Sequence, residues 1–590
     1  MKSVSAGRSG RNAPLYSKGG PRIPSRIVEL FDACSRSDRR ASLFLVGLCL
    51  LALLPGFFSI PPVDRNEARF AEISRQMVDT GHLGETRLGW EVKRTRPIGQ
   101  HWLQAAVVAA AEKVGISSAD RRIWLYRLPS LASAIAAVLL TFWAALAFTH
   151  RRAAMLAASL LAGSVAFSVG GRLAIPEMSL LAATAAMIGA LGRLYLAERH
   201  GEALAYPAHS GGDGRLALIF WAALAFGLFA KGLMTPIYVI LPLAALTLVD
   251  RSARFLRRAR SYTGLALILL VAVGWFLLRR YGAVDTQEAA LARGLIGRVL
   301  PDYPGFTGPP GSYLLLFWAM FWPGAPLAAL AVPIIWKARR IGAVRFLLAW
   351  ILPAWLLFEL WPVKLPAYVG PTLPAIAILI ALAVERGAMA LGNTRLARVL
   401  WLWPVIGAAI AVAALLGLAV FDRTTSVLAW PFLLLGFFAL VTAASSVREY
   451  GVEKSALLAI AGMLVSGFGV MQLVLPNLDS FWLSQRMVAV AAQEPCAAGG
   501  GEIEVASAGY SEPSLVFLLP RPPRLLDGAA AADFLKEGGC RVVFVDRRHE
   551  ARFARRAEAL GLRIQRGTEL RGLAYGDLRE VRITAYRSGS

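Results

Sequence analysis

The stretch PPVDRNEARFAEISRQMVDTGH, residues 61–82, follows directly on an apolar run at 42–60 that is long enough to span a membrane. From position 64 to position 75 it carries the polar or charged side chains Asp64, Arg65, Asn66, Glu67, Arg69, Glu72 and Arg75. Ionisable groups beside a membrane span are costly and tend to mark function. The rest of the chain therefore has to explain this charge cluster.

The composition is that of a polytopic α-helical membrane protein. The chain has 590 residues, of which 56% are hydrophobic and 17% charged, against about 25% charged in an ordinary soluble protein. The mean hydropathy is +0.54. The net charge of +25 would suggest nucleic acid in a soluble protein. Here we assign it to basic loops that fix membrane orientation, and we expect no nucleic-acid partner.

Apolar runs predict about thirteen membrane spans. They lie near 42–60, 125–148, 153–170, 177–196, 215–231, 234–249, 261–279, 313–336, 344–361, 367–385, 398–420, 426–446 and 455–476. With the N-terminus inside, the arginine-rich segments such as DRSARFLRRARS fall on the inner side, as the positive-inside rule requires. An odd number of spans places both the first loop, 61–124, and the tail outside. The expected location is a bacterial inner membrane, with the site facing the periplasm.

Three regions follow from this reading. Residues 1–40 form a basic, Ser/Gly/Arg/Pro-rich N-terminus that we expect to be disordered and cytoplasmic, and the run at 42–60 is an uncleaved anchor. Residues 41–478 form the transmembrane part. Residues 479–590 form a small outer α/β domain, with strands at EIEVASA, RVVFVD and EVRITAY and helices at AAADFLKEG and RHEARFARRAEALG. Cys496 and Cys540 share this tail, either as a disulfide or as two unrelated buried thiols.

The opening stretch also has a purely structural interpretation. Asp64 at the N-cap and Glu67 three positions later match a capping box, and Phe70, Ile73 and Met77 form an apolar stripe. These features predict a short amphipathic helix on the outer membrane interface. Capping does not explain Asn66 or Arg69. The loop 61–124 also holds many arginines on the outer side, and their guanidinium groups suit phosphate.

Several motifs, in order, carry a family resemblance. After DRNEARFAEISRQMVDTGHL come KRTRPIGQHWLQA, RLAIPEMSLL, FAKGLMTP, FWPGAPL, VKLPAYVGPTLPA and, in the tail, GYSEPSLVFLLP. Over roughly residues 42–590 the chain resembles the membrane-embedded GT-C glycosyltransferases of the protein O-mannosyltransferase and aminoarabinose transferase superfamily. The resemblance implies a sugar donor on a polyprenyl phosphate such as undecaprenyl phosphate. It also implies transfer with inversion on the outer face, to lipid A, another glycolipid, a polysaccharide or a protein.

The resemblance assigns roles to individual residues. The lipid phosphate that leaves needs cationic groups to stabilise its developing charge. The family positions for these groups fall on Arg69, Arg96, Lys231 and Lys364, together with Tyr368. Acidic family positions fall on Glu67 and on Glu177, which follows a proline at the start of the fourth span. Ala367 departs from a histidine that is common in related bacterial sequences.

The main departure is Asn66, which stands where the family has a carboxylate that is often catalytic. An amide cannot act as a general base. Three explanations stay open: Asp64, Glu67 or Glu177 is the base, the acceptor is an already nucleophilic phosphate, or the enzyme is degraded. Glu177 is the preferred carboxylate, although a plain acidic helix start is its structural alternative.

The sequence contains few residues that suggest a bound cofactor. We expect no certain cofactor, although His101 in IGQHWLQ is a candidate ligand for a divalent metal, with a structural role as the alternative. Besides a glycosyltransferase that binds membrane lipids, a lipid donor and a lipid or glycan acceptor, a transporter or flippase for a lipid-linked anion would use the same arginines. The absence of an internal repeat and the position of polar residues at the outer ends of spans favour the enzyme.

Overall fold

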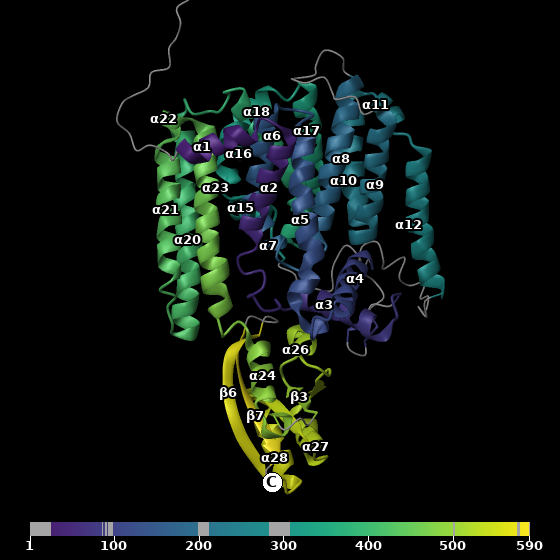
Figure 1. The fold of residues 1–590 in the computed structure, drawn as a ribbon, viewed down its shortest axis with the longest axis vertical. Helices are drawn as coiled ribbons and strands as arrows, with labels where there is room; N and C mark the ends of the chain where they lie inside the picture. The colour runs from purple at the N-terminus through teal and green to yellow at the C-terminus, as the bar shows by residue number, and fades with distance from the viewer. Residues whose placement is uncertain are drawn as a thin grey trace, which may run out of the picture.

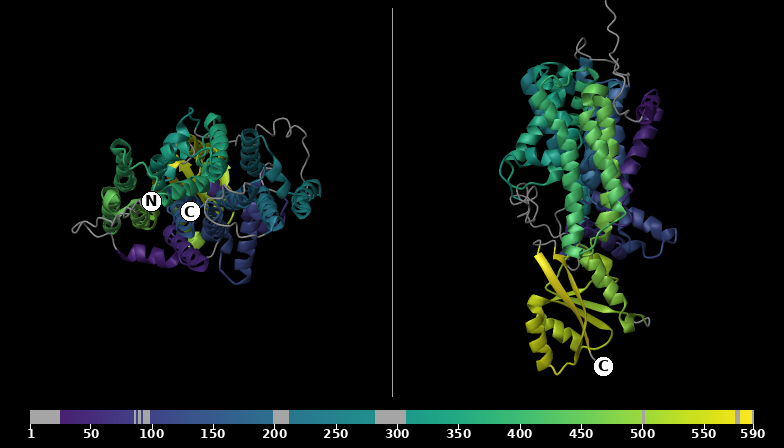
Figure 2. Two further views of the ribbon diagram at one scale, coloured as in Figure 1. Left: turned by 90° about the horizontal axis from the view of Figure 1, so that it is seen from above. Right: turned by 90° about the vertical axis from the view of Figure 1, so that its left-hand side faces the viewer.

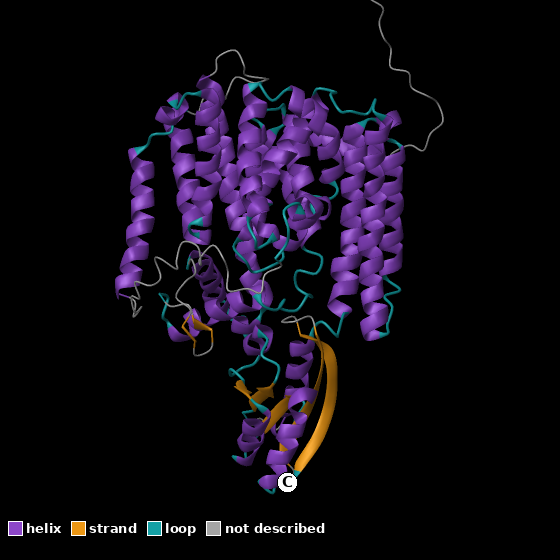
Figure 3. Ribbon diagram, turned by 180° about the vertical axis from the view of Figure 1, so that it is seen from behind, coloured by secondary structure: helices purple, strands orange, loops and turns teal. Residues whose placement is uncertain are grey.

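The computed structural model describes residues 25–84, 87–88, 91–92, 98–198, 212–281, 307–498, 502–574 and 579–588. A bundle of helices makes up the larger part, and a mixed sheet with its own helices projects from one end of the bundle (Figure 1). Figure 3 shows strands only at that end, in the sheet and in a short hairpin. The hairpin is β1 (Arg87–Leu88) with β2 (Glu91–Val92).

The bundle consists mainly of apolar helices. They are α1 (Ser25–Cys34), α2 (Asp38–Leu53), α5 (Ile123–Ala145), α6 (Arg151–Ala162), α7 (Val165–Gly170), α8 (Glu177–Glu198), α9 (Asp213–Lys231), α10 (Met234–Asp250), α11 (Arg254–Arg258), α12 (Tyr262–Tyr281), α15 (Ser312–Met320), α16 (Gly324–Lys337), α17 (Gly342–Leu360), α18 (Leu373–Glu385), α19 (Thr394–Ala397), α20 (Leu402–Gly417), α21 (Ala429–Ser445), α22 (Val447–Tyr450) and α23 (Val452–Phe468).

This architecture is that of a multi-pass membrane protein. Within the described residues, seven helical segments are long and apolar enough to cross a membrane, and four further apolar helices are shorter. Each of the thirteen expected spans overlaps a helix or a pair of helices. The number of crossings itself stays a prediction.

Two expected spans are divided into shorter helices. The run at 153–170 forms α6 and α7, because the Ser164 hydroxyl accepts a hydrogen bond from Phe167 N and begins a new helix. The run at 313–336 forms α15 and α16, which meet at Pro323, a residue that has no N–H and disfavours a helical conformation before it. Neither helix break could be predicted from the sequence, because both runs are hydrophobic throughout.

Helix α8 lies at the centre of the bundle, packed against α5 and α9. Its small residues make this possible: a Cβ on Gly189 would come within 2.3 Å of the Trp143 ring, and one on Gly192 within 2.5 Å of Phe148. Glycine at such positions lets membrane helices approach closely. The packing fixes where the first residue of α8, Glu177, lies.

The charged stretch after the first apolar run folds as α3 (Asn66–Thr80), and α4 (Gly99–Lys113) follows it. Both lie at the end of the bundle that carries the sheet (Figure 1). The expected apolar stripe of Phe70, Ile73 and Met77 is buried, and so are Glu72 and Arg75. Helix α3 is therefore packed between other parts of the protein, and much of its charge does not face water.

The tail begins with α24 (Leu483–Ala492) and contains a five-stranded sheet. Its strands are β3 (Glu504–Ala508), β4 (Arg524–Leu526), β5 (Arg541–Asp546), β6 (Ile564–Ala574) and β7 (Arg579–Ser588), in the order β4-β3-β5-β7-β6. Strands β4 and β5 are parallel to β3, whereas β7 is antiparallel to β5 and β6. The turned view in Figure 2 shows this unit beyond the helix ends.

Successive side chains of β5 point to opposite faces of the sheet, and both faces are covered by helices, which explains the apolar run RVVFVD. Val542 and Phe544 pack with α24 and with α26 (Pro513–Leu518), whereas Val543 and Val545 pack with α27 (Gly528–Lys536) and α28 (Arg547–Ala559). A strand covered on both faces is apolar throughout. The expected strands and helices of the tail are confirmed, and β4 and β6 are added. Cys496, in α25 (Pro495–Ala498), and Cys540 form a disulfide, which decides between the two alternatives.

Candidate functional site

The first residue of α8 meets the last residue of α9. Because the two helices are neighbours and run in opposite directions, Glu177 and Lys231 lie at the same end of the bundle, and Lys231 Nζ donates to Glu177 Oε1 at 2.6 Å. An acid at a helix start and a base at a helix end both suit the helix dipole. The side chains are 21% and 20% exposed. Among the described residues, Glu177 Oε2 is buried and accepts no hydrogen bond.

The KLPAY segment lies beside this pair. Tyr368, in a short 3-10 turn (Pro366–Tyr368), is close enough for the Glu177 carboxylate to act on its phenol electrostatically. The Tyr238 hydroxyl donates to the Tyr368 carbonyl, and the Tyr313 hydroxyl donates to the Leu365 carbonyl. Two aromatic hydroxyls from α10 and α15 thus hold the segment in place.

Lys364 is oriented differently from what a phosphate ligand requires. Its side chain is buried, and Nζ donates to the backbone carbonyls of Phe358 at 3.1 Å and Glu359 at 2.5 Å. The ammonium also lies 5.3 Å from the centre of the Tyr313 ring. In this structure Lys364 closes the end of α17.

Glu67 forms a buried ion pair with Arg127 of α5. Arg127 Nε lies 2.7 Å from Glu67 Oε1, and Arg127 Nη2 lies 2.9 Å from Glu67 Oε2. The remaining donors of Arg127 bind the carbonyls of Phe57, Ile60 and Pro61. A two-pronged pair of this kind is the strongest form of salt bridge geometry. Arg127 therefore fixes both α3 and the chain that leads into it.

The same carboxylate holds the approach to α8. Glu67 Oε1 also accepts from Ala174 N at 2.9 Å, and Gln104 Nε2 of α4 donates to the Ala174 carbonyl at 2.9 Å. Ala174 stands three residues before Glu177. The acidic residue of the first loop and the acidic residue of α8 are thus linked through one short segment.

The expected capping box is wrong. Helix α3 begins at Asn66, and its N-cap, Arg65, has φ 68° and makes no capping bond through its side chain. Asp64 instead accepts a hydrogen bond at Oδ1 from Ser514 N, in the tail. Glu67 does reach back, but to Val63 N at 2.9 Å. A tertiary contact has replaced the local one.

Burial changes the acid strength of Asp64. Burial, reinforced by the neighbouring Glu512 carboxylate, raises the pKa of Asp64 to about 7, while Ser514 and Arg65 act in the opposite direction. Both the position and the bonding of Asp64 differ from those of a base that is open to substrate.

Asn66 and Arg69 share one side of α3, since they lie one turn apart. Asn66 is exposed and Arg69 is half-buried. Arg96, the other arginine expected to contact phosphate, lies outside the described residues. The roles of these three residues in binding stay predictions.

His101 occupies a structural position. Its Nδ1 lies 2.9 Å from Ser74 Oγ, and its ring stacks on Phe70. In the part of the chain that the structure describes, no three His, Cys, Asp or Glu side chains come together as a metal site would require. The expected structural alternative for His101 fits these contacts better than metal ligation does.

Known proteins resemble this chain in sequence and in fold. Two curated relatives are each named undecaprenyl phosphate-alpha-4-amino-4-deoxy-L-arabinose arabinosyl transferase. The one from Pectobacterium carotovorum subsp. carotovorum (strain PC1) is 25% identical over 400 residues, which is 65% of this chain and 66% of the relative. The one from Aeromonas hydrophila is 26% identical over 352 residues, 55% of this chain and 57% of the relative. The alignments thus span less than two thirds of the relatives' own length. No family model matches the chain.

The solved structure of ArnT from Cupriavidus metallidurans in the apo state superposes with a TM-score of 0.65. It is 20% identical, and the match covers 92% of this chain and 97% of that one. The same protein bound to undecaprenyl phosphate gives a TM-score of 0.64 at 19% identity. The chain thus shares the fold of this ArnT and is distantly similar in sequence to the two arabinosyl transferases. The resemblance that the motifs indicated is thereby confirmed.

Two arginines that hold the segments around Glu67 and Glu177 were missed from sequence. Arg127 stands inside an apolar helix, and an arginine within a span is itself a signal of function or of a buried partner. Arg172 opens the RLAIPEMSLL motif, and its guanidinium binds the carbonyls of Pro55, Ala52 and Ser168, which ties the approach to α8 to the end of α2. Attention to charge inside apolar motifs would have found both.

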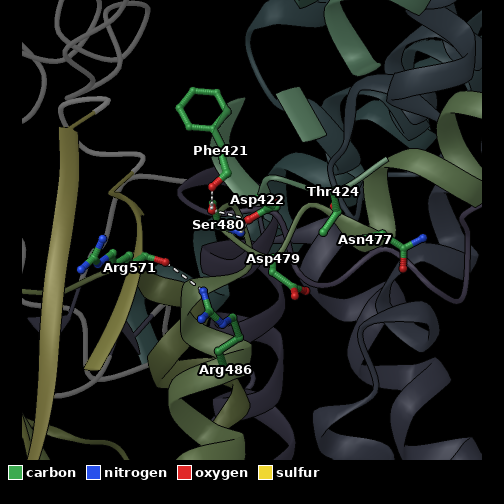
Figure 4. A pocket seen from close by; sticks show the side chains of 8 residues that line it. All are labelled: Phe421, Asp422, Thr424, Asn477, Asp479, Ser480, Arg486 and Arg571. Carbon is green, nitrogen blue, oxygen red and sulfur yellow. Dashed lines mark hydrogen bonds between the residues drawn. The ribbon is translucent and has the colours of Figure 1, made fainter. Parts of the chain in front are cut away.

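A polar hollow of about 440 Å³ lies elsewhere on the ArnT-like fold, where the helix bundle meets the sheet (Figure 4). Asp422, at the end of the π-helical turn Leu418–Asp422 that follows α20, accepts hydrogen bonds from both N and Oγ of Ser480. Arg486 Nη1 donates to the Arg571 carbonyl at 2.8 Å. Leu573 N of β6 in turn donates to the Ser480 carbonyl. None of the expected site residues lines this hollow, and its contacts join the sheet to the bundle.

Proposed function

We propose that the chain is a glycosyltransferase that moves a sugar from a polyprenyl-phosphate donor to a lipid, such as lipid A, or to another envelope acceptor. The observation that carries the proposal is the state of Glu177. One carboxylate oxygen is held by Lys231, and the other is buried and accepts no hydrogen bond among the described residues. A carboxylate that is oriented through one oxygen and has no hydrogen-bond partner at the other keeps an acceptor position for the proton of a hydroxyl.

The proposed reaction is a single displacement. The acceptor hydroxyl attacks the anomeric carbon of the sugar as Glu177 Oε2 takes its proton, and the bond from that carbon to the phosphate oxygen breaks. The electron pair leaves with the polyprenyl phosphate, and the configuration of the sugar inverts. Lys231 has three N–H donors and uses one on Glu177, so that it can also stabilise the charge that develops on the phosphate.

The relatives support the donor class. Both curated relatives are named as transferases that use an undecaprenyl phosphate-linked aminoarabinose, and the solved ArnT was captured with undecaprenyl phosphate. Asp64 and Glu67 are engaged in buried contacts, which leaves Glu177 as the carboxylate best suited to be the base. Arg69 and Arg96 remain the proposed phosphate ligands from the first loop, together with Tyr368 beside Glu177.

The proposed location is a bacterial inner membrane with the site on the periplasmic face. Helix α3, the start of α8 and the tail lie at one end of the bundle, and the tail holds a disulfide. Disulfides persist in oxidising compartments such as the periplasm. The basic loops at the other end agree with a cytoplasmic side.

The test is comparative mass spectrometry of envelope glycolipids and glycans from cells with and without the protein. A mass difference equal to one sugar should appear only with the intact protein. The molecule that carries the added sugar is the acceptor. Glu177→Gln should lose the difference, because loss of a general base costs about 10²–10⁴-fold in rate. The control Glu112→Gln changes an exposed glutamate on α4 and should keep it. No sugar difference in any envelope fraction would contradict the proposed function, and full activity of Glu177→Gln would contradict the base.

A further inference from the structure

Helix α26 of the tail is held at both ends by side chains from the first loop. At its start, Asp64 Oδ1 accepts from Ser514 N at 2.8 Å. At its end, Arg75 Nη1 donates to the carbonyls of Phe517 at 2.9 Å and Leu519 at 3.2 Å. The first N–H groups and the last carbonyls of a helix have no partner within the helix. Here one short stretch of chain, some 440 residues earlier, supplies both partners.

These contacts are buried. Asp64 is 8% exposed and Arg75 is 4% exposed. Between them, Phe517 packs edge-on against the Tyr126 ring of α5 at 5.3 Å and shares a cluster with Ala71 of α3. Arg75 is itself oriented by Glu72, whose Oε1 accepts from Nη2 at 3.1 Å. Polar groups at both ends and an apolar contact in the middle fix the distance and the angle between α26 and α3.

Helix α3 passes this constraint to the start of α8. Glu67, one turn after Asp64, binds Ala174 N, and Ser74 Oγ binds Gln104 Oε1 at 2.7 Å, while Gln104 holds the Ala174 carbonyl. Ala174 is three residues from Glu177. The tail is therefore connected to the proposed base by buried hydrogen bonds, by the backbone of α3 and by the short segment from Ala174 to Glu177.

We infer that Asp64 and Arg75 are positioning residues, which dock α26 of the tail on α3 and thereby set the geometry of Glu177. The inference rests on the proposed function for its effect on catalysis. It reassigns Asp64, a candidate base by sequence, to a role that touches no substrate. A misplacement of about 1 Å at a reacting group costs about 10²-fold in rate.

Charge couples this docking to pH. Asp64 faces Glu512, Arg65 and Ser514, and burial raises its pKa to about 7. Glu72 faces Arg75, Gln76 and Asp79, and burial likewise raises its pKa to about 7 against the opposing effect of Arg75. A carboxyl whose pKa is higher when docked favours docking at low pH, and this contribution is lost progressively between its undocked and its docked pKa. Docking should therefore weaken as the pH rises from about 4 to about 7, and change little above that.

The experiment measures amide hydrogen exchange of the full-length protein in detergent, at Ser514 and at Ala174, beside the rate of sugar transfer and the binding of undecaprenyl phosphate. Asp64→Ala and Arg75→Ala should speed exchange at both amides and lower kcat by about 10²-fold, with donor binding changed less than about threefold. Arg122→Ala is the control and should change neither, because Arg122 is an exposed arginine of the same loop whose side chain, among the described residues, hydrogen-bonds to Ser117.

Asp64→Asn separates positioning from catalysis. An amide oxygen can still accept from Ser514 N but cannot serve as a base. This variant should keep slow exchange and near-normal kcat. Its exchange at Ser514, corrected for the intrinsic rate, should depend less on pH, because only the contribution of Glu72 remains. If Asp64→Asn is as inactive as Asp64→Ala while Ser514 stays protected, Asp64 is catalytic and the inference fails.

The exchange measurements keep the docking testable apart from the proposed reaction. If Asp64→Ala and Arg75→Ala leave Ser514 protected, the two residues do not dock α26. If Ser514 loses protection and Ala174 does not, the docking does not reach α8. Either result overturns the inference even if no sugar transfer is ever observed. If exchange changes as expected and the wild-type protein transfers no sugar, the docking is supported and the proposed function is contradicted.

Discussion

Glu67 uses both of its oxygens on buried partners, which makes it a support for the site. Its carboxylate faces Arg127, Ala174 N and Val63 N, and both members of the ion pair are almost fully buried. Removing one partner of a buried pair leaves an uncompensated charge, whereas removing both can be nearly neutral. The residue should therefore matter for stability more than for chemistry.

Glu67→Gln or Arg127→Met should each lower the free energy of unfolding by about 3–5 kcal/mol. The double variant should recover part of the loss, since it leaves no lone charge. Thermal unfolding of the purified protein in one detergent measures all three. Equal and additive losses in the double variant would mean that the two charges do not depend on each other.

Asn66 offers a second residue-scale prediction. It is exposed at the first position of α3, where an acidic side chain is favoured, so that Asn66→Asp should fold normally and preserve or raise transfer. The double variant Asn66→Asp, Glu177→Gln decides which carboxylate is the base. It should stay inactive in the sugar-transfer assay. Recovery of activity would move the base from Glu177 to position 66.

Residue types were easier to predict than residue partners. The motifs indicated Glu177, Lys231 and Tyr368, and the structure brings them together. It turns Lys364 toward backbone carbonyls instead. Motifs record which side chains a site uses, whereas a partner depends on how separate helices pack. The contact of Asp64 with Ser514, across 450 positions, had no local signal.

At the scale of elements, α3 combines a buried side with a side that carries Asn66 and Arg69. Glu67, Ser74 and Arg75 bind other parts of the protein, so that one face of α3 is structural. The side with Asn66 and Arg69 is the one that we propose faces the donor phosphate.

Arg69→Ala should lower transfer by about 10²-fold, the scale of losing one donor that stabilises developing charge. Arg69→Lys keeps the charge but loses the planar fork, and should recover only part of the rate. Steady-state transfer rates measure both, and thermal unfolding checks that α3 stays folded. Wild-type rates for Arg69→Ala would leave this arginine without a part in leaving-group stabilisation.

Hydrophobic runs predicted where helices lie but not where they break. Ser164 and Pro323 divide two runs that look continuous, because caps and missing N–H groups act locally within an apolar stretch. Strand β6 was missed for the opposite reason. Its residues from Gln565 to Glu569 are exposed and polar, and the strand is defined by its pairing with β7. Pairing of this kind is not visible in a single sequence.

At the scale of the whole molecule, the first loop and the tail touch, so that they lie on one side of the membrane. This follows from the bonds of Asp64 and Arg75 to α26. The side on which they lie stays a prediction from the basic loops. Counting spans was a weaker guide than this contact, since the seven long apolar helices of the described residues do not by themselves fix the topology.

Cysteine labelling of intact cells tests the side. In a variant with Cys34 and Cys49 replaced by serine, Glu112→Cys in α4 and Glu502→Cys in the tail should react with a reagent that does not cross the membrane. Arg395→Cys, exposed at the opposite end of the bundle, should react only after lysis. A protected position 502 beside a reactive position 112 would contradict the shared side.

The span between Arg75 and Phe517 sets an order of events during synthesis. The two residues are 442 positions apart, and a ribosome adds about 5–20 residues per second, so that α3 waits roughly 20–90 s for the helix it will hold. The pair of Glu67 with Arg127, only 60 positions apart, can form within seconds of translocation. A nascent chain can thus form the Glu67–Arg127 pair early and the α3–α26 contact only late, so that a chain truncated before α26 keeps the first and lacks the second.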